Sequence, residues 1–371
     1  MFSGSGIVSR STRLNNSGLA PATVTYDAPP NHPCIAVELE VKAILLDRFG
    51  GPEVLKLGEA AAPAAAPGRV LIRVAATSVN RPDLIQRQGH YPPPPGESEI
   101  LGLEAAGTVE AVGGGVTDFA PGERVFALLG GGGYAELASA YAGHVMKMPP
   151  NLSFEQAACI CETYITAHMN LFGNARLQDG ETVLLHGGGG GVTTAAMELC
   201  RGLVPHARVL VTASTAKVAR VKALGADAVI DYKNEDFADA VLRLTDRRGA
   251  DVILDHIGGA YLAQNQKALA TGGRLAVIGV MGGRRGELDI GRLLTQRQSI
   301  LGSVLRPRTT EQKTAIIHAF ARDVLPLFAS GAIAPLIDAV YPLERAADAH
   351  RAMESSSHFG KLVLRVAETT R

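Results

Sequence analysis

Cysteine is scarce in this sequence of 371 residues, which contains Cys34, Cys159, Cys161 and Cys200 and no Cys-x-x-Cys pair. Scattered cysteines fit neither a disulfide framework nor a tetrahedral zinc site. The His-Glu-x-x-His segment of metalloproteases and the Gly-x-Ser-x-Gly segment of serine hydrolases are also missing. We therefore expect reduced thiols in a cytoplasmic protein that binds no metal.

An excess of one charge sign is absent as well, because 36 Lys and Arg residues balance 36 Asp and Glu residues. This balance gives no electrostatic reason to expect a nucleic acid or an anionic membrane as a partner. No apolar run approaches the ~18–20 residues that span a bilayer. Hydrophobic residues nevertheless make up 46% of the sequence, enough for a sizeable core. These features favour a globular protein with a small-molecule partner over a protein that binds nucleic acid or a membrane.

Residues 1–40 differ in composition from the rest of the chain. They are rich in Ser, Asn, Pro and Thr, and they contain Arg10 and Arg13 but no acid before Asp27. An organellar transit peptide has this kind of composition. A disordered tail, or an upstream stretch translated from a misassigned start, explains it equally simply. We favour a disordered N-terminal extension over a transit peptide.

Short strands dominate the next part of the chain. The segments "VKAILLD" (41–47) and "RVLIRVAATSVN" (69–80) alternate apolar and polar residues, and further short strands follow, separated by Gly and Pro turns. This pattern predicts a β-rich domain of meander or barrel type. The segment "HFGKLVLRV" (358–366) alternates in the same way, and we expect it to return to this domain.

After Leu152 the rhythm changes to helical patterns, such as residues 153–172, alternating with short apolar strands. The strands are predicted at 182–186, 207–212, 227–231, 251–259, 273–280 and 298–303. Helical stretches lie between most of them. Strand–helix alternation at this spacing predicts a doubly wound parallel sheet, and therefore an α/β fold.

The segment "LLHGGGGGVTTAAMEL" (184–199) holds five consecutive glycines at the first strand-to-helix turn of this sheet. A helix N-terminus at such a turn offers N–H groups to a pyrophosphate, and glycine lets the phosphates approach the backbone. The dinucleotide fingerprint falls on Gly188, Gly190 and Thr193, where the third position normally carries glycine. The residues predicted to bind the cofactor here are Gly188, Gly189, Gly190, Gly191 and Val192. A flexible glycine loop without a ligand is the alternative.

The end of the second strand indicates which dinucleotide binds. An NAD site usually has an acid there to hold the ribose 2′-hydroxyl, but no Asp or Glu occurs between Glu198 and Asp227. Ser214, Lys217 and Arg220 are present instead, and hydroxyls and cations suit a 2′-phosphate. We therefore expect NADPH as the cofactor, with Ser214 and Lys217 in contact with it. The alternative for Lys217 is a solvated helix lysine.

Five further segments carry a resemblance to a known family. They are "NRPDLIQRQGHYPPPPG" (80–96), "GGPEVL" (50–55), "ILGLEAAGTV" (100–109), "ALLGGGGYAE" (127–136) and "GKLVL" (360–364). With them, the chain resembles the NAD(P)H:quinone oxidoreductase family of the zinc-free medium-chain dehydrogenase/reductases. The resemblance implies a GroES-like catalytic domain in two parts, 41–161 and 305–371, around a Rossmann NADP-binding domain at 162–304. It also implies a homodimer or homotetramer.

The resemblance also bears on the chemistry. Zinc-dependent relatives carry a histidine ligand after the glycine of the "GLEAAG" segment, where this chain has Leu103. Without such ligands no Lewis acid polarises the substrate. The implied activity is therefore direct, metal-free hydride transfer from NADPH to a quinone or an activated enone. The alternatives are a trans-2-enoyl thioester reductase of the same fold and a low-turnover NADPH-binding scaffold, the latter favoured by Gly190 and Thr193.

Catalytic residues are carried over from the family one position at a time. Asn80, Tyr91 and Thr166 match positions near the nicotinamide and the substrate. The alternative for Asn80 is a side chain that makes a turn, and the alternative for Tyr91 is packing on the prolines at 92–95.

Further positions match the family's cofactor contacts. Lys217 resembles its 2′-phosphate lysine, Tyr232 its adenosine-side tyrosine, and Lys361 a lysine that meets the cofactor. A solvated strand lysine is the alternative for Lys361. Gly258, Gly279 and Met281 follow two later strands and would border the cofactor at their carboxyl ends.

Overall fold

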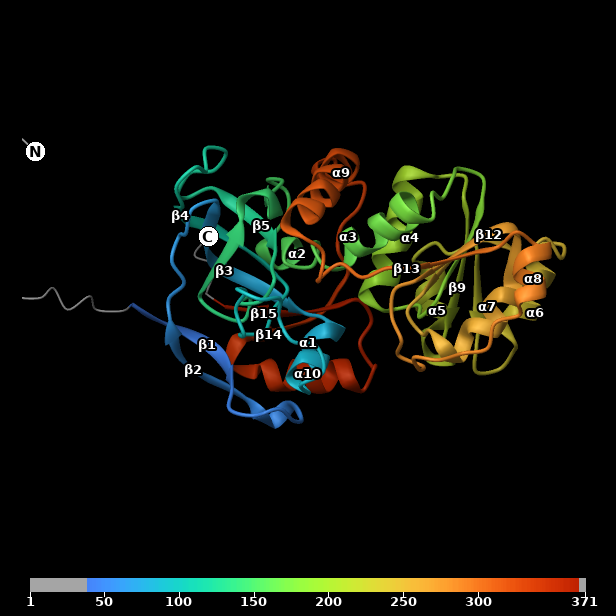
Figure 1. The fold of residues 1–371 in the computed structure, drawn as a ribbon, viewed down its shortest axis with the longest axis horizontal. Helices are drawn as coiled ribbons and strands as arrows, with labels where there is room; N and C mark the ends of the chain where they lie inside the picture. Colours follow the sequence, from blue (N-terminus) through green and yellow to red (C-terminus); the bar gives the residue numbers. More distant parts are fainter. Residues whose placement is uncertain (1–38, 367–371) are drawn as a thin grey trace, which may run out of the picture. The chain divides into compact units, whose positions relative to one another are not determined.

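The computed structural model describes residues 39–366 (Figure 1). The predicted N-terminal extension at 1–40 therefore lies, apart from its last two residues, outside the described residues. Two large sheets and a two-stranded hairpin organise the rest of the chain. The predicted α/β fold, with a parallel sheet and a GroES-like domain, is confirmed.

The six-stranded sheet is parallel throughout, with the order β10-β9-β8-β11-β12-β13. Its strands are β8 (Thr182–Leu185), β9 (Arg208–Ala213), β10 (Ala228–Asp231), β11 (Ala250–Asp255), β12 (Leu269–Val277) and β13 (Ser299–Gly302). Its helices are α4 (Gly191–Leu203), α5 (Val218–Ala223), α6 (Phe237–Leu244), α7 (Leu262–Ala268) and α8 (Ile290–Thr295). This is the strand order of dinucleotide-binding sheets. The central strands are apolar because helices cover both faces, and Val183, Leu184 and Leu185 of β8 are fully buried.

The sequence pattern predicts which segments form strands more accurately than it predicts where each strand begins and ends. The strand predicted at 251–259 ends at Asp255, because the chain turns at Gly258 with a φ of 81°. The strand predicted at 273–280 begins earlier, at Leu269, and ends at Val277. Both differences shorten the carboxyl ends of strands and leave the following residues to form loops.

The seven-stranded sheet has the order β14-β15-β3-β4-β5-β7, and β6 pairs with β3. Its strands are β3 (Arg69–Val79), β4 (Glu104–Val112), β5 (Arg124–Leu128), β6 (Leu137–Tyr141), β7 (Val145–Lys147), β14 (Ile337–Pro342) and β15 (Lys361–Arg365), and β1 (Glu40–Leu46) forms the hairpin with β2 (Leu55–Ala61). β15 pairs antiparallel with β3, so Leu362 lies opposite Val79. Figure 1 shows this return of the chain end to the first strands, as the alternation at 358–366 predicts.

The remaining helices are α1 (Arg81–Arg87), α2 (Phe154–Ala157), α3 (Thr163–His168), α9 (Thr310–Ala329) and α10 (Ala346–Glu354). The helical pattern at 153–172 is interrupted by a turn between α2 and α3, and α3 continues into a π-helical segment at Met169–Asn174. One apolar cluster includes Phe126 of the seven-stranded sheet, Ile165 of α3 and Val211 of the six-stranded sheet. This shared core holds α3 between the two sheets. The domain boundaries at 161/162 and 304/305 stay predictions.

Candidate cofactor and active site

The two central strands of the parallel sheet define a crevice at their carboxyl ends. β8 lies between β9 and β11, so the connections that leave β8 and β11 run to opposite sides of the sheet. Ligands of such sheets bind where this reversal occurs. Gly187 follows β8 closely and His256 follows β11 directly, and a Cβ on Gly187 would lie 2.4 Å from His256 Nε2. The glycine run therefore lies at this point of the sheet.

The glycines of the run serve different geometric needs. Gly187 and Gly189 have φ values of 69° and 92°, which side chains of L-residues rarely adopt. Gly188 has no room for a Cβ, which would lie 2.9 Å from Val211 Cγ1 and 2.8 Å from Val221 Cγ2. Gly190 is the N-cap of α4, whose first turn contains no acid and receives no side-chain cap. The first N–H groups of α4, from Gly191 and Val192 onward, are therefore available to an anion.

Thr193 replaces the third glycine of the fingerprint without leaving a buried hydroxyl unpaired. The residue is 1% exposed, and its Oγ1 donates a hydrogen bond of 2.6 Å to the carbonyl of His186. The side chain is thus part of the contact between α4 and the end of β8. The substitution is accommodated by a local hydrogen bond, so the turn keeps its shape.

Lys217 lies beyond the end of β9 and is half-buried. Its Nζ donates to the carbonyls of Ser356 at 2.8 Å and His358 at 2.7 Å, so the solvated helix lysine considered above is not what the structure contains. Burial lowers the pKa of Lys217. Ser214 precedes the short turn at Thr215–Lys217 and makes no side-chain cap there. Both residues follow the end of β9 within four residues.

The segment before β15 borders the glycine run. The Gly360 N–H donates to the Gly189 carbonyl at 2.8 Å, and Gly190 forms an isolated parallel bridge with Gly360. A Cβ on Gly189 would lie 2.6 Å from Cδ2 of Phe359. The chain end thus contributes backbone and an aromatic ring to the wall of the crevice.

The loops after β10, β11 and β12 contain the other residues predicted at the cofactor. Gly258 has a φ of 81°, and a Cβ there would lie 2.9 Å from the Gly279 carbonyl oxygen. Glycine is needed because the two loops touch backbone to backbone. Tyr232 and Met281 are 36% and 54% exposed. All four residues follow the carboxyl ends of their strands, on the edge that carries the glycine run.

Three polar side chains form a buried cluster where β15 meets β3. Asn80, Glu104 and Lys361 are 4%, 1% and 3% exposed. Lys361 Nζ lies 2.6 Å from Asn80 Oδ1 and 3.0 Å from Glu104 Oε1. Asn80 Nδ2 donates to the same Glu104 oxygen at 2.8 Å. Lys361 is therefore not the solvated strand lysine considered as an alternative. The Asn80 side chain turns toward the cluster, while its backbone N–H donates to the Asp83 carboxylate at 2.8 Å.

Asp83 holds helix α1, and with it Asn80, in place. Its carboxylate also accepts a hydrogen bond from the Gly102 N–H at 3.2 Å and lies 3.3 Å from the Tyr134 hydroxyl. That hydroxyl contacts His350 Nε2 of α10 at 3.1 Å. Burial raises the pKa of Asp83 to about 6, although these hydrogen bonds oppose the shift. The chain of contacts ties α1 to the start of β4 and to α10.

Tyr91 and Thr166 lie on other segments of the site. The Arg306 guanidinium lies 4.9 Å from the centroid of the Tyr91 ring and donates to the Tyr91 carbonyl at 2.9 Å. Burial raises the pKa of Tyr91 to about 12, and the charge of Glu162 acts in the same direction. Thr166 is a partly exposed residue of α3, which is otherwise buried from Thr163 to His168. Arg306 thus brings the chain after β13 onto the Tyr91 segment.

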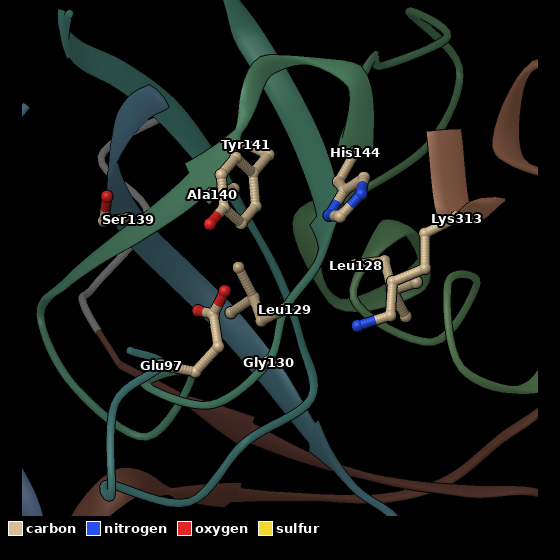
Figure 2. Close-up of a pocket in the computed structure, with 9 residues that line it drawn as sticks. All are labelled: Glu97, Leu128, Leu129, Gly130, Ser139, Ala140, Tyr141, His144 and Lys313. Carbon is tan, nitrogen blue, oxygen red and sulfur yellow. The ribbon is translucent and has the colours of Figure 1, made fainter. Parts of the chain in front are cut away.

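A small pocket opens beside this segment (Figure 2). Glu97, Tyr141, His144 and Lys313 line it, together with Gly130, whose carbonyl accepts a hydrogen bond from Arg306. Figure 2 shows the Lys313 amine and the Glu97 carboxylate directed toward the same space. Arg306 therefore links the Tyr91 segment to Gly130 in the lining of this pocket.

The donor set around Asn80 is unlike a zinc site. Within residues 39–366, no group of three His, Cys, Asp or Glu side chains is arranged to hold a metal ion. Leu103 is an apolar residue that is 2% exposed, and the Lys361 ammonium already pairs with Glu104. The thiols of Cys159, Cys161 and Cys200 are free and buried, and burial raises the pKa of Cys200 to about 12.

Comparison with known proteins decides the family. A model of the zinc-binding dehydrogenases matches residues 224–364, and a model of the alcohol dehydrogenase GroES-like domain matches residues 66–150. The quinone oxidoreductase of Rattus norvegicus is 35% identical over 332 residues, which cover 87% of this chain and 97% of that protein. The chain belongs to the zinc-free quinone oxidoreductase family of medium-chain dehydrogenase/reductases.

Other proteins are similar to this chain over most of its length. The synaptic vesicle membrane protein VAT-1 homolog of Rattus norvegicus is 33% identical over 342 residues, with 87% of this chain and 84% of that protein covered. A mycobacterial protein solved with NADPH has a TM-score of 0.78 and 31% identity, covering 88% of this chain and all of its own. A quinone oxidoreductase of Pseudomonas syringae has the same TM-score at 30% identity, with the same coverage. The chain is thus an oxidoreductase with a nicotinamide dinucleotide site.

Two acids of this site escaped the sequence patterns. Glu104 is buried in it, and Glu162 adjoins Glu104. An acid beside Leu103 in the apolar "GLEAAG" segment was an available signal for Glu104. No local signal distinguished Glu162 from other acids near a helix start.

In the part of the chain that the structure describes, no helix combines the length and the apolar character needed to cross a membrane.

Proposed function

We propose that the protein transfers hydride from NADPH directly to quinones or activated enones, without a metal ion. The observation that carries this proposal is the uncapped start of α4 at the reversal point of the sheet, with Lys217 where an NAD site would place an acid. The NADPH complex of the mycobacterial neighbour supports this choice of cofactor. The protein's location in the cytoplasm stays a prediction.

The residues of the site fit such a cofactor in separate ways. The α4 N-terminus and the glycine run would bind the pyrophosphate, and Ser214 and Lys217 the 2′-phosphate. Tyr232, Gly258, Gly279 and Met281 would border the rest of the dinucleotide. When bound, NADPH supplies the hydride.

The reacting end lies on the other side of the crevice. Asn80, Tyr91 and Thr166 would orient the acceptor, and Lys361 would hold Asn80 in position through its hydrogen bond of 2.6 Å. Leu103 offers no ligand for a Lewis acid, so the acceptor must already be electrophilic. Quinones and α,β-unsaturated carbonyls meet this requirement.

The test of the proposed function is NADPH oxidation with 1,2-naphthoquinone, with crotonyl-CoA and with no acceptor. We expect oxidation with the quinone. Oxidation with the thioester alone would instead identify a trans-2-enoyl thioester reductase, an alternative supported by the similarity to the CurK enoyl reductase, which is 26% identical with a TM-score of 0.78. A higher melting temperature with NADPH, but no oxidation with either acceptor, would identify a low-turnover scaffold.

Replacing Lys217 by alanine should weaken NADPH binding about 10-fold or more, equivalent to ~1.4 kcal/mol, because the 2′-phosphate loses its cation. NADH binding should stay within about 2-fold. Fluorescence titration of both dinucleotides measures the two affinities. Lys222→Ala is the matched control, since Lys222 Nζ binds the carbonyls of Ala226 and Asp227. An equal loss for NADPH and NADH would show that Lys217 acts only through its bonds to Ser356 and His358.

We also propose that a second copy of the chain pairs along β13. Among the described strands, β13 is an end strand of the parallel sheet, and unpaired edges readily recruit another strand. Large exposed apolar side chains lie in the segments around it: Val280, Met281, Ile290, Leu294 and Val304. Leu294 is 70% exposed, and several exposed apolar residues close together are typical of an interaction surface.

Leu294→Glu combined with Ile290→Lys should convert this homodimer, or a tetramer built from it, to smaller species. Burying the two new charges in an interface would be unfavourable. Light scattering after size exclusion measures the mass. Leu57→Glu, at an exposed position of β2, should leave the mass unchanged. A wild-type mass equal to that of one chain would refute the pairing.

A further inference from the structure

Glu162 occupies the turn at which the chain enters α3. Its backbone N–H donates to Glu104 Oε2 at 2.9 Å, which attaches it to the cluster of Asn80, Glu104 and Lys361. Its side chain is partly exposed and forms no hydrogen bond with another residue in the range 39–366. A carboxyl group in such surroundings usually has a partner. The free carboxyl therefore calls for a role outside the fold itself.

Helix α3 has one partly exposed face, and Glu162 begins it. Glu162 and Thr166 are four residues apart, so they share one face of the helix. Both are partly exposed, while Thr163, Tyr164 and Ile165 between them are buried. Thr163 itself lies against the glycine run, because a Cβ on Gly191 would be 3.0 Å from its Cγ2. Glu162 therefore directly precedes the residue that meets the start of α4, and it shares a helix face with Thr166.

Charged groups from four elements or segments act on this carboxyl. They are Glu104 on β4, Asp83 on α1, Lys361 on β15 and Arg306 after β13. The charge of Glu162 acts in turn on Tyr91 and on Lys313 of α9. The two cations among them are paired elsewhere: Lys361 with Glu104 and Asn80, and Arg306 with two backbone carbonyls and Gln86. Burial, and then the two acids, raise the pKa of Glu162 to about 8.

We propose that Glu162 is a catalytic residue whose carboxylic acid protonates the reduced acceptor. The inference rests on the proposed function. The hydride of NADPH carries two electrons to the quinone and leaves NADP⁺ and a hydroquinone anion. The Oε–H bond of Glu162 breaks, an O–H bond forms on the acceptor oxygen, and the carboxylate regains a proton from water. One quinone, one NADPH and one proton thus give one hydroquinone and one NADP⁺.

The pH dependence follows from the direction of the shift. The acid form donates the proton, and it is lost as the pH rises through the pKa of about 8. The kcat for quinone reduction should therefore be constant near neutral pH and fall on the alkaline side. Asp83 has a pKa of about 6, so its titration would affect the acidic side instead.

Glu162→Gln is the decisive variant, because the amide keeps the size of the side chain but has no acidic proton. We expect a loss of kcat of about 100-fold or more, an unchanged Kd for NADPH, and no alkaline fall in the remaining activity. Glu162→Asp should recover part of kcat together with the alkaline fall. Glu198→Gln is the matched control. Glu198 is another partly exposed carboxyl with a raised pKa, but it accepts a hydrogen bond from Tyr164 and its replacement should leave kcat unchanged.

A second readout needs no cofactor. The infrared band of a protonated carboxyl should disappear between about pH 7 and about pH 9.5 in the wild-type protein, and this change should be missing in Glu162→Gln. Wild-type kcat with a retained alkaline fall in Glu162→Gln would overturn the assignment. A wild-type protein that reduces neither quinones nor enones would overturn the proposed function, and the proton donor with it. The wild-type assay therefore separates the two failures.

Discussion

Gly189→Val is expected to reduce NADPH affinity by at least about 100-fold, equivalent to ~2.7 kcal/mol. Gly189 has a φ of 92°, a conformation that a β-branched residue almost never adopts. A Cβ there would lie 2.6 Å from Phe359 Cδ2 and 3.1 Å from Lys217 Cδ. The turn must therefore change its shape. This change would break the hydrogen bond between the Gly189 carbonyl and the Gly360 N–H, and it would disturb the alignment of the α4 N–H groups.

Titration calorimetry with NADPH measures this loss, and thermal unfolding shows how much of it reflects the stability of the whole protein. Strain at one backbone position costs ~1–3 kcal/mol, so we expect a folded variant. Gly114→Val is the control, because a Cβ at Gly114 meets nothing within 4 Å and its φ is not positive. A Gly189→Val protein that binds NADPH within about 2-fold of wild type would show that the turn does not hold the pyrophosphate.

Lys361→Met is expected to have the largest effect on stability, lowering the free energy of unfolding by ~3–5 kcal/mol. The substitution removes the ammonium but leaves the Glu104 carboxylate, which is 1% exposed, without its charge partner. Asn80 also loses its contact of 2.6 Å. Because a buried charge without a counterion is unfavourable, the loss should greatly exceed that of a surface pair.

Urea unfolding of a double-mutant cycle with Glu104→Gln tests this prediction. The double variant should be clearly more stable than the sum of the two single effects predicts, because each single change leaves the other partner unpaired. Lys147→Met is the matched control, since its pair with Glu123 at 2.8 Å is largely exposed. We expect a change below ~1 kcal/mol for that surface pair. A similar small change for Lys361→Met would mean that water solvates the cluster.

The parts of the site that depend on residues close together in sequence could be predicted, and the parts that depend on distant segments could not. The glycine run, the helix start after it and the missing acid at the end of β9 are neighbours in sequence, and their prediction needed only the strand–turn–helix pattern. Lys217 was predicted as a cofactor residue in this way, and that role stays a prediction. Its bonds to Ser356 and His358, 139 and 141 residues away, were not. Those bonds depend on where the chain end packs, which no nearby residue determines.

The cluster at Asn80 shows the same limit more clearly. The motifs led to Asn80 and Lys361 but assigned neither the partner nor the burial of either residue. Lys361 meets Glu104 across 257 residues of sequence, because β15 pairs with β3 in one register. A shift of that register by one residue would turn the lysine to the other face of the sheet.

The amino-acid order alone determined the alternation of strands and helices, the parallel sheet and the position of the glycine-rich turn. Periodicity and the conformational demands of glycine act over a few residues, so they can be recognised without coordinates. The pairing of Lys361 with Glu104, the accommodation of Thr193 and the free carboxyl of Glu162 emerged only when distant segments were packed together. Burial and electrostatics depend on every neighbour in space, and those neighbours come from five or more separate segments of the chain.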